Sequence, residues 1–265
     1  MLLNNWIKSY INPVTYPNNI WFRHHFERNF DAIFLGNGID AHNYPQTSVE
    51  GPKVFNLALR NQTLLRDFKV LKQNFSILKP GGKAYFPIDA VSIMVDSDVQ
   101  DKRPYVYTDY GHTLSLSKTI QVYKKLCKYY PVLMLRFADY RYLVRHKLHG
   151  DEQYHDDVVR FIRCSHTIKG RSLEGIESRI TDIMDFCKER NIVPVFILKP
   201  VSSVLKNEDL DMSMQALTAI LKHNGSEYID LYSKEECCCP DLYAADGMLM
   251  NEKGRDISKS CIDEN

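Results

Sequence analysis

The chain has 265 residues, of which 44% are hydrophobic and 25% are charged, a composition typical of a globular protein with enough apolar mass for a core. This composition excludes a disordered tail, a coiled coil and a small disulfide scaffold, and we expect one domain over residues 1–265. Because 34 Lys and Arg residues balance 33 Asp and Glu residues, no overall field draws the chain to nucleic acid, and we expect no nucleic-acid partner.

The first half of the chain alternates short apolar runs with a helical pattern, as expected for a parallel sheet that helices cover on both faces. Three apolar runs, at 31–36, 53–57 and 83–88, predict the first three strands. Between the second and the third run, apolar residues recur at helical spacing and predict a helix over 62–78. The Pro-Gly-Gly turn at 80–82 is expected to end this helix.

The middle section, residues 91–169, breaks this alternation with helical stretches that contain Tyr and His. After it, one apolar face predicts a helix over 172–190, and a strand follows at 192–198. A further helix over 210–221 and a last strand at 228–231 complete the alternation. The sequence therefore predicts a mainly parallel sheet of five strands, with a helical insertion or cap between the third and the fourth.

The run at 192–198 is the most hydrophobic of the predicted strands. Its continuous apolar character suits a central parallel strand that is buried on both faces. Pro194 is unusual at such a position, because proline has no N–H to donate to a neighbouring strand. We nevertheless expect this strand to lie in the interior of the sheet.

Loops that follow the strands are the expected place for a site, because open α/β sheets bind ligands at the carboxyl ends of their strands. Four segments are of this kind: 36–44, 58–63, 89–92 and the residues after Leu231. If all four leave the sheet at the same edge, they surround one crevice.

Three short motifs in these segments occur in a recognisable order. They read LGNGID at 35–40, NLALRNQTL at 56–64 and DGMLMNEKG at 246–254, and an LKPGG turn precedes the third strand. In this order they resemble the SGNH (GDSL-like) hydrolase superfamily, in particular its branch found in surface-polysaccharide biosynthesis loci. The resemblance implies a three-layer α/β/α sandwich with a flavodoxin-like sheet. It also implies hydrolysis or transfer of acyl esters by a Ser after the first strand and a late His–Asp pair.

The residues that carry this chemistry in the family are replaced here. The nucleophile position falls on Gly38, preceded by Asn37, and neither side chain forms an acyl-enzyme ester in the usual way. In the late motif Asp246 matches the acid and Asn251 matches a later position, but Leu249 stands where the family has its base. The sequence therefore predicts a degenerate site without Ser–His catalysis. The resemblance then implies a binding or accessory role in polysaccharide or glycan modification, with a glycan or acylated sugar as partner and no cofactor.

An active acyl esterase or O-acyltransferase is the alternative, with a non-standard catalytic site built from Asp40, His42 and Asp246. The residues expected to bind a ligand are Asn37, Gly38, Arg60, Asn61, Asp89 and Asn251. We expect the segments around Gly38, Asn61 and Asp246 to converge on one concave surface, because each would follow a strand of the same parallel sheet. A second interpretation of Arg60 and Asn61 is a capped turn before the following helix.

A class I methyltransferase is a less favoured alternative. An acidic residue beside the first strand and the LKPGG turn are common in the middle of that family. Its glycine-rich cofactor loop would have to come one βαβ unit earlier. Only about 30 residues precede the strand, roughly the minimum for such a unit, and no Gly occurs before Gly36.

The seven cysteines are odd in number and irregularly spaced, which argues against a secreted disulfide framework. The N-terminal segment is interrupted by Asn and Pro and does not fit a signal peptide, and no run of about 18 apolar residues could span a bilayer. We therefore expect a cytoplasmic protein. The adjacent Cys237, Cys238 and Cys239 lack a second ligand pair, so no metal site is predicted and their role stays open.

Overall fold

The computed structural model describes residues 29–44, 52–58, 63–91, 93, 158–159, 161–162, 164, 173 and 175–264. All of them belong to one compact unit, formed by residues 28–99 and 154–265. Most of the predicted helical insertion at 91–169 lies outside the described residues. The insertion and the single domain over 1–265 therefore stay predictions.

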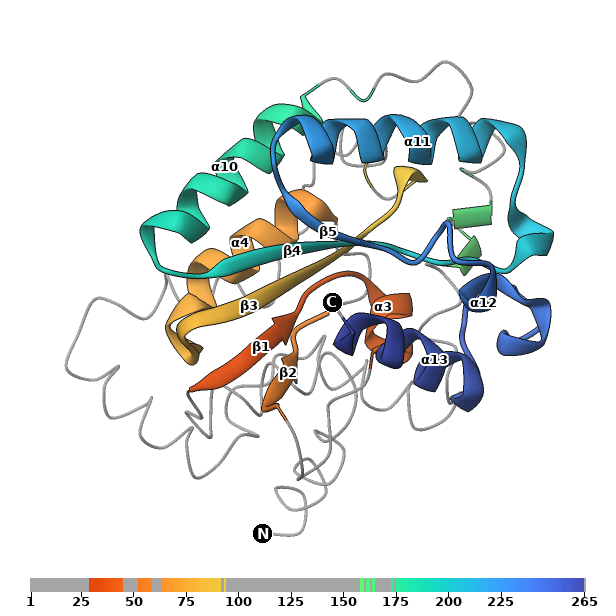
Figure 1. The fold of residues 1–265 in the computed structure, drawn as a ribbon, viewed down its shortest axis with the longest axis horizontal. Helices are drawn as coiled ribbons and strands as arrows, with labels where there is room; N and C mark the ends of the chain where they lie inside the picture. The colour runs from red at the N-terminus through yellow and green to blue at the C-terminus, as the bar shows by residue number, and fades with distance from the viewer. Residues whose placement is uncertain are drawn as a thin grey trace, which may run out of the picture. The chain divides into compact units, whose positions relative to one another are not determined.

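Five strands form one sheet in the order β2-β1-β3-β4-β5 (Figure 1). The strands are β1 (Phe30–Phe34), β2 (Val54–Asn56), β3 (Leu78–Ile88), β4 (Val193–Leu198) and β5 (Glu227–Asp230). Every neighbouring pair is parallel, so the predicted five-stranded α/β class is confirmed. The strand order reverses between β1 and β3, which is the switch point where open α/β sheets bind ligands.

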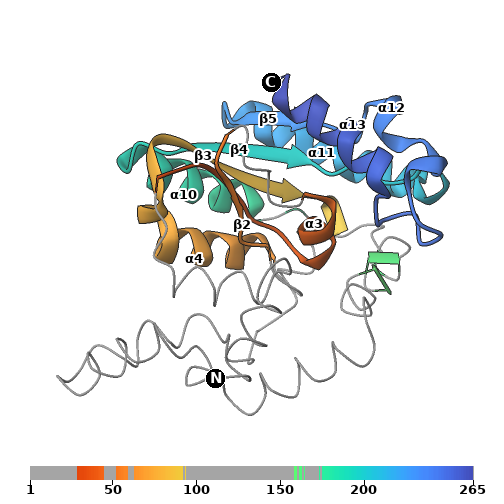
Figure 2. The same ribbon diagram turned by 90° about the horizontal axis from the view of Figure 1, so that it is seen from below.

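Helices cover both faces of this sheet and give the fold three layers (Figure 2). The helices are α3 (Gly38–Asn43), α4 (Leu64–Asn74), α10 (Ile176–Glu189), α11 (Glu208–His223), α12 (Glu235–Cys238) and α13 (Glu252–Asp263). On one face α4 packs beside α10, where the Phe68 and Phe186 rings meet edge to face at 5.5 Å. On the other face, Cys237 of α12 and Ile262 of α13 share a buried cluster with Val195 of β4.

The two long helices that flank β4 in the chain follow from the apolar spacing of their residues. Each buries one stripe at helical intervals, made of Ile176, Ile180, Ile183 and Cys187 in α10 and of Leu210, Met214, Leu217 and Leu221 in α11. At the start of α11, the Asn207 side chain accepts a hydrogen bond from the backbone of Leu210. This N-cap satisfies one of the backbone donors that a helix start leaves without a partner.

The strand β4 lies between β3 and β5, as predicted for the run at 192–198. It is buried from Pro194 to Leu198, which agrees with its uniformly apolar sequence. The missing N–H of Pro194 is tolerated because β5 pairs with β4 only from Val195 onward. The proline therefore lies near the strand start, where sheets accept it.

The predicted helix over 62–78 ends too late. The helix α4 stops at Asn74, and after one short 3-10 turn Leu78 already belongs to β3. The Pro-Gly-Gly segment at 80–82 forms an irregularity inside that strand, where its register with β1 shifts. A single apolar residue at the end of a helical pattern fits a helix face and a strand equally well, so periodicity alone could not place Leu78.

Two further elements differ from the prediction, and one part of the chain had no predicted element. The segment 36–44, expected as a loop, contains the short helix α3. The segment after Leu231, for which no helix was predicted, contains α12 and α13. The helix predicted over 172–190 begins only at Ile176. Gly175 before it has a left-handed backbone with φ 80°, a conformation that cannot continue a right-handed helix.

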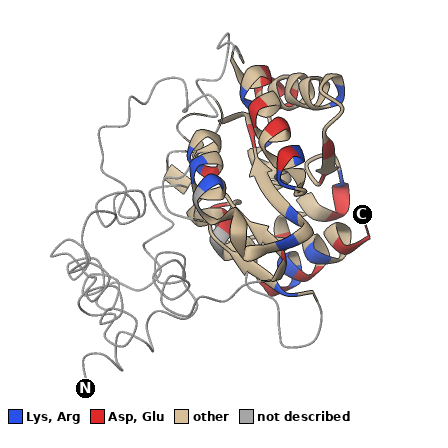
Figure 3. Ribbon diagram, turned by 90° about the vertical axis from the view of Figure 1, so that its left-hand side faces the viewer, with Lys and Arg blue, Asp and Glu red and all other residues tan. Residues whose placement is uncertain are grey.

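Charged residues of both signs are interspersed over the described helices (Figure 3). No helix in the described part of the chain is long and apolar enough to cross a membrane.

Candidate functional site

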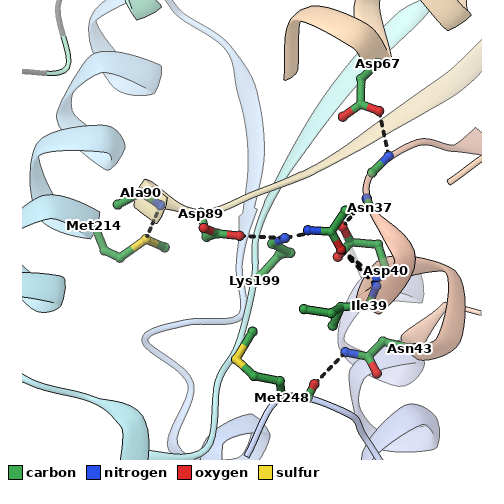
Figure 4. Close-up of polar contacts among 11 residues, drawn as sticks. Asn37, Ile39, Asp40, Asn43, Asp67, Asp89, Ala90, Lys199, Met214 and Met248 are labelled. Atoms are coloured by element: carbon green, nitrogen blue, oxygen red, sulfur yellow. Dashed lines mark hydrogen bonds and ion pairs between the residues drawn. The ribbon is translucent and has the colours of Figure 1, made fainter. Parts of the chain in front are cut away.

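Three charged side chains meet at the carboxyl edge of the sheet, beside the switch point between β1 and β3 (Figure 4). The Nζ atom of Lys199 lies 2.6 Å from Oδ2 of Asp89 and 3.3 Å from Oδ2 of Asp40. Asp40 is 1% exposed, Asp89 2% and Lys199 4%. We call these three side chains the buried charge cluster.

Strand register places two members of the cluster side by side. Ile88 ends β3 and pairs with Leu198, which ends β4, and a charged residue follows each of them directly. The backbone N–H of Lys199 donates to the carbonyl of Ile88 at 3.0 Å, so the ladder continues one step beyond the strands. Asp89 and Lys199 are therefore neighbours because their strands end at the same level.

The third member, Asp40, comes from the first turn of α3. The side chain of Asn37 accepts hydrogen bonds from the backbone of Ile39 and Asp40, and Oδ2 of Asp40 accepts from the N–H of Asn37 at 2.7 Å. This reciprocal pair is a capping box, which fixes the start of the helix. The same Oδ2 atom faces Lys199, so one carboxylate oxygen serves both the helix cap and the cluster.

Burial raises the pKa of Asp40 from 3.8 to about 6, against the opposing effect of the Lys199 ammonium. Burial alone would lower the pKa of Lys199, but the carboxylates of Asp40 and Asp89 outweigh it and hold that pKa above its usual value. Lys199 is therefore a cation at neutral pH. The Oδ1 atom of Asp40 is buried and has no hydrogen-bond partner among the described residues.

A small cavity adjoins the cluster and is lined in part by Gly36, Asp40, Asp67 and Lys199. Its volume is about 10 Å³, which is room for about one water molecule. Asp67, from α4, closes one side by accepting a hydrogen bond from the N–H of Gly36 at 2.9 Å. As it stands, the cavity is too small for a sugar ring or an acyl chain.

Replacing Gly36 by Ala should lower the free energy of unfolding by about 2–4 kcal/mol. The backbone φ of Gly36 is 112°, and a Cβ atom there would lie 2.5 Å from Oδ2 of Asp40. Urea unfolding of the full chain measures the loss. Gly81→Ala is the matched control, because Gly81 also has a positive φ, 77°, but a Cβ there meets nothing within 4 Å. Equal losses in the two variants would contradict a clash with Asp40.

The helix α3 also contacts the late motif. The Nδ2 atom of Asn43 donates to the carbonyl of Met248 at 3.1 Å, and its Oδ1 atom accepts from the N–H of Met250 at 2.9 Å. The Nε2 atom of His42 lies 3.0 Å from the carbonyl oxygen of Met250, to which Arg255 also donates. These contacts bring the segment after β1 and the late motif together.

Two predicted site residues of the late motif are engaged in local turns. Oδ1 of Asp246 accepts hydrogen bonds from the N–H groups of Met248 and Leu249 at 2.8 and 2.9 Å. Oδ1 of Asn251 accepts from the N–H of Gly254 at 3.0 Å and caps α13. Both side chains therefore stabilise the turn and the helix that follow them.

The structure gives Asp40, His42 and Asp246 three separate sets of contacts. Asp40 faces Lys199, whereas His42, two residues along the same helix, contacts the backbone of the late motif. Residues two apart on a helix do not face each other. Asp89, expected to bind a ligand, does come close to Asp40, with Lys199 between them. Lys199 was not among the predicted site residues, although a charged residue directly after an apolar interior strand is a signal for this edge of the sheet.

The other predicted ligand-binding residues lie on α3 or beyond the described part. Gly38 is the buried first residue of α3, and Asn37 caps that helix. Arg60 and Asn61 lie outside the described residues, so the predicted convergence of all three segments stays a prediction. Within the described ranges, no group of three or more His, Cys, Asp or Glu side chains could hold a metal ion.

Comparisons with known proteins give structural similarity only. No family model matches the chain, and no curated protein matches it. A GDSL-like lipase from Bacteroides thetaiotaomicron is 10% identical, with 88% of this chain and 85% of that chain covered and a TM-score of 0.43. The lipase/acylhydrolase from Enterococcus faecalis is 13% identical, with coverages of 87% and 92% and a TM-score of 0.41. A mutant acetyl-xylooligosaccharide esterase from Geobacillus Stearmophilus is 10% identical, with coverages of 89% and 93% and a TM-score of 0.43.

Proposed function

We propose that this protein has a GDSL-like hydrolase fold but has lost ester hydrolysis. It acts by binding, in an accessory role in surface-polysaccharide or glycan modification. Two observations support the loss of ester hydrolysis. The charged groups at the carboxyl edge of the sheet are engaged with one another in a buried cluster, and the position where the family has its nucleophile holds Gly38.

Acyl transfer needs three kinds of group, and two of them are missing from the matching positions. A nucleophile needs a hydroxyl or thiol, which Gly38 lacks, and a base must take its proton. Leu249, at the base position, cannot accept a proton. Lys199 cannot substitute as a base because its pKa lies above the usual value and its ammonium is bound by two carboxylates. Backbone N–H donors alone give only weak residual catalysis.

One observation favours the second candidate, an esterase or O-acyltransferase with a non-standard site. The pKa of Asp40, about 6, lies near the range in which general bases work at neutral pH. Against this candidate, Asp40 is buried, His42 contacts the carbonyl of Met250, and Asp246 accepts from the N–H of Met248. Within the described residues, nothing adds to the methyltransferase alternative.

The test measures turnover and binding on the same full-length protein. We expect p-nitrophenyl acetate hydrolysis at the rate of the buffer control, and the same rate for His42→Ala. Saturable binding of acetylated oligosaccharides, followed by calorimetry without release of acetate, is the expected positive result. Turnover by the natural chain that disappears in His42→Ala would overturn the proposal and establish the esterase. The same calorimetry is run with a panel of oligosaccharides and nucleotide sugars. Failure to bind any of them would overturn the glycan role.

A further inference from the structure

Two cysteine side chains touch each other between α12 and α13. Cys237 of α12 and Cys261 of α13 are 24 residues apart in the chain, and their Sγ atoms lie 3.7 Å apart. Both residues are buried, Cys237 at 1% and Cys261 at 5% exposed, and both are reduced thiols in this structure. The two sulfurs are therefore in van der Waals contact.

The two sulfurs have different surroundings. The Lys234 amine contacts the Cys261 sulfur, and this contact is the main cause of the raised pKa of Lys234. On the other side, Sγ of Cys261 lies 3.6 Å from the Glu236 carboxylate. Cys261 is thus the member of the pair whose sulfur touches charged side chains. Burial is the main cause of the raised pKa of Cys237, which is about 12.

We propose that Cys237 and Cys261 form a reversible disulfide when the protein meets a hydroperoxide. The Cys261 thiol gives up its proton as its sulfur attacks one peroxide oxygen. The O–O bond breaks, which gives a sulfenic acid and a hydroxide ion that takes that proton to form water. The Cys237 sulfur then attacks the sulfenic sulfur, the S–S bond forms, and the S–OH bond breaks. The proton of Cys237 leaves with that oxygen as water. A dithiol reverses the change by exchange.

The position of the pair gives the disulfide a structural effect. The bond would close a loop that contains the residues by which the late motif contacts α3, namely Met248 and Met250. It would also fasten α12 to α13 on one face of the sheet. Because a disulfide restricts the unfolded chain more than the folded one, closing this loop should raise Tm by roughly 5–10 °C. The inference stands apart from the proposed function, since it requires neither glycan binding nor ester chemistry.

The experiment treats the reduced full-length protein with hydrogen peroxide, blocks remaining thiols with an alkylating agent, and maps peptides without reduction. We expect a cross-linked peptide pair that joins residue 237 to residue 261, together with the rise in Tm. Both changes should reverse with dithiothreitol. Cys239→Ser is the matched control, because Cys239 belongs to the same run of three cysteines as Cys237 but is exposed. This variant should keep the cross-link and the Tm shift.

Cys237→Ser and Cys261→Ser should each abolish the cross-link and the rise in Tm. The test does not require these variants to fold, because the peptide map of the natural chain shows by itself whether the disulfide forms. Full alkylation of Cys237 and Cys261 after peroxide treatment would overturn the inference. A cross-link that involves Cys238 or Cys239 in their place would overturn it as well.

Discussion

Replacing Lys199 by Met should lower the free energy of unfolding by about 3–5 kcal/mol at pH 7. The variant removes the cation that lies between the buried carboxylates of Asp40 and Asp89. Breaking a buried ion pair from one side is among the most destabilising single changes, because the remaining charge has lost its water and its partner. Urea unfolding of the full chain, followed by circular dichroism, measures the loss.

A set of matched variants separates charge from packing in this experiment. Lys222→Met removes a lysine from the exposed end of α11 and should change stability by less than about 0.5 kcal/mol. The triple variant Asp40→Asn, Asp89→Asn, Lys199→Met removes all three charges and should recover much of the loss. A loss below about 1 kcal/mol for Lys199→Met would contradict a buried charge cluster, as would a triple variant no more stable than Lys199→Met.

Asp40 should make the protein less stable as the pH rises from about 4 to about 6. Its pKa is about 6 in the folded chain against an ordinary 3.8, so the folded state binds more protons than the unfolded state in this range. The contribution of the neutral Asp40 carboxyl to the free energy of unfolding is fully present below pH 4 and is lost as the pH rises through 6. A shift of this size corresponds to a change on the order of 3 kcal/mol.

The difference in stability between the natural chain and Asp40→Asn, measured by urea unfolding from pH 4 to pH 7.5, isolates this effect from all other titrating groups. We expect Asp40→Asn to become the more stable protein toward pH 7, because Lys199 keeps Asp89 as its partner at 2.6 Å. Asp31→Asn is the control whose difference should stay flat over this range, since the contact with Lys79 holds the pKa of Asp31 below its usual value and its titration lies below pH 4. A difference that does not change with pH would contradict a titrating Asp40.

The strands were predictable because their signal is local. Each of the five apolar runs overlaps a strand, and the run at 192–198 forms a strand in the interior of the sheet that is buried from Pro194 to Leu198. The helix α13 lacks such a signal, because its buried positions include Gly254, Ser258 and Cys261 beside Ile262. Small and polar residues on the buried face of a helix do not produce an apolar stripe.

The sequence could predict the edge of the sheet at which the candidate site lies, but not the contacts of its side chains. The rule that ligands bind at the carboxyl ends of parallel strands correctly brought Asp40 and Asp89 to the same edge. It could not show that Lys199 lies between them, since this depends on β3 and β4 ending at the same level. It also could not show that Asp246 uses its carboxylate on the backbone two and three residues ahead.

The contact between Asn43 and Met250 has a consequence for the order of events during synthesis. The two residues are 207 positions apart, and chains emerge from the ribosome with their N-terminus first. Contacts between such distant residues also form slowly, because a very long loop must close before they can be made. The helix α3 follows the first strand and is among the earliest described parts to be made. Its hydrogen bond to Met250 therefore forms only after the residues around Met250 have emerged.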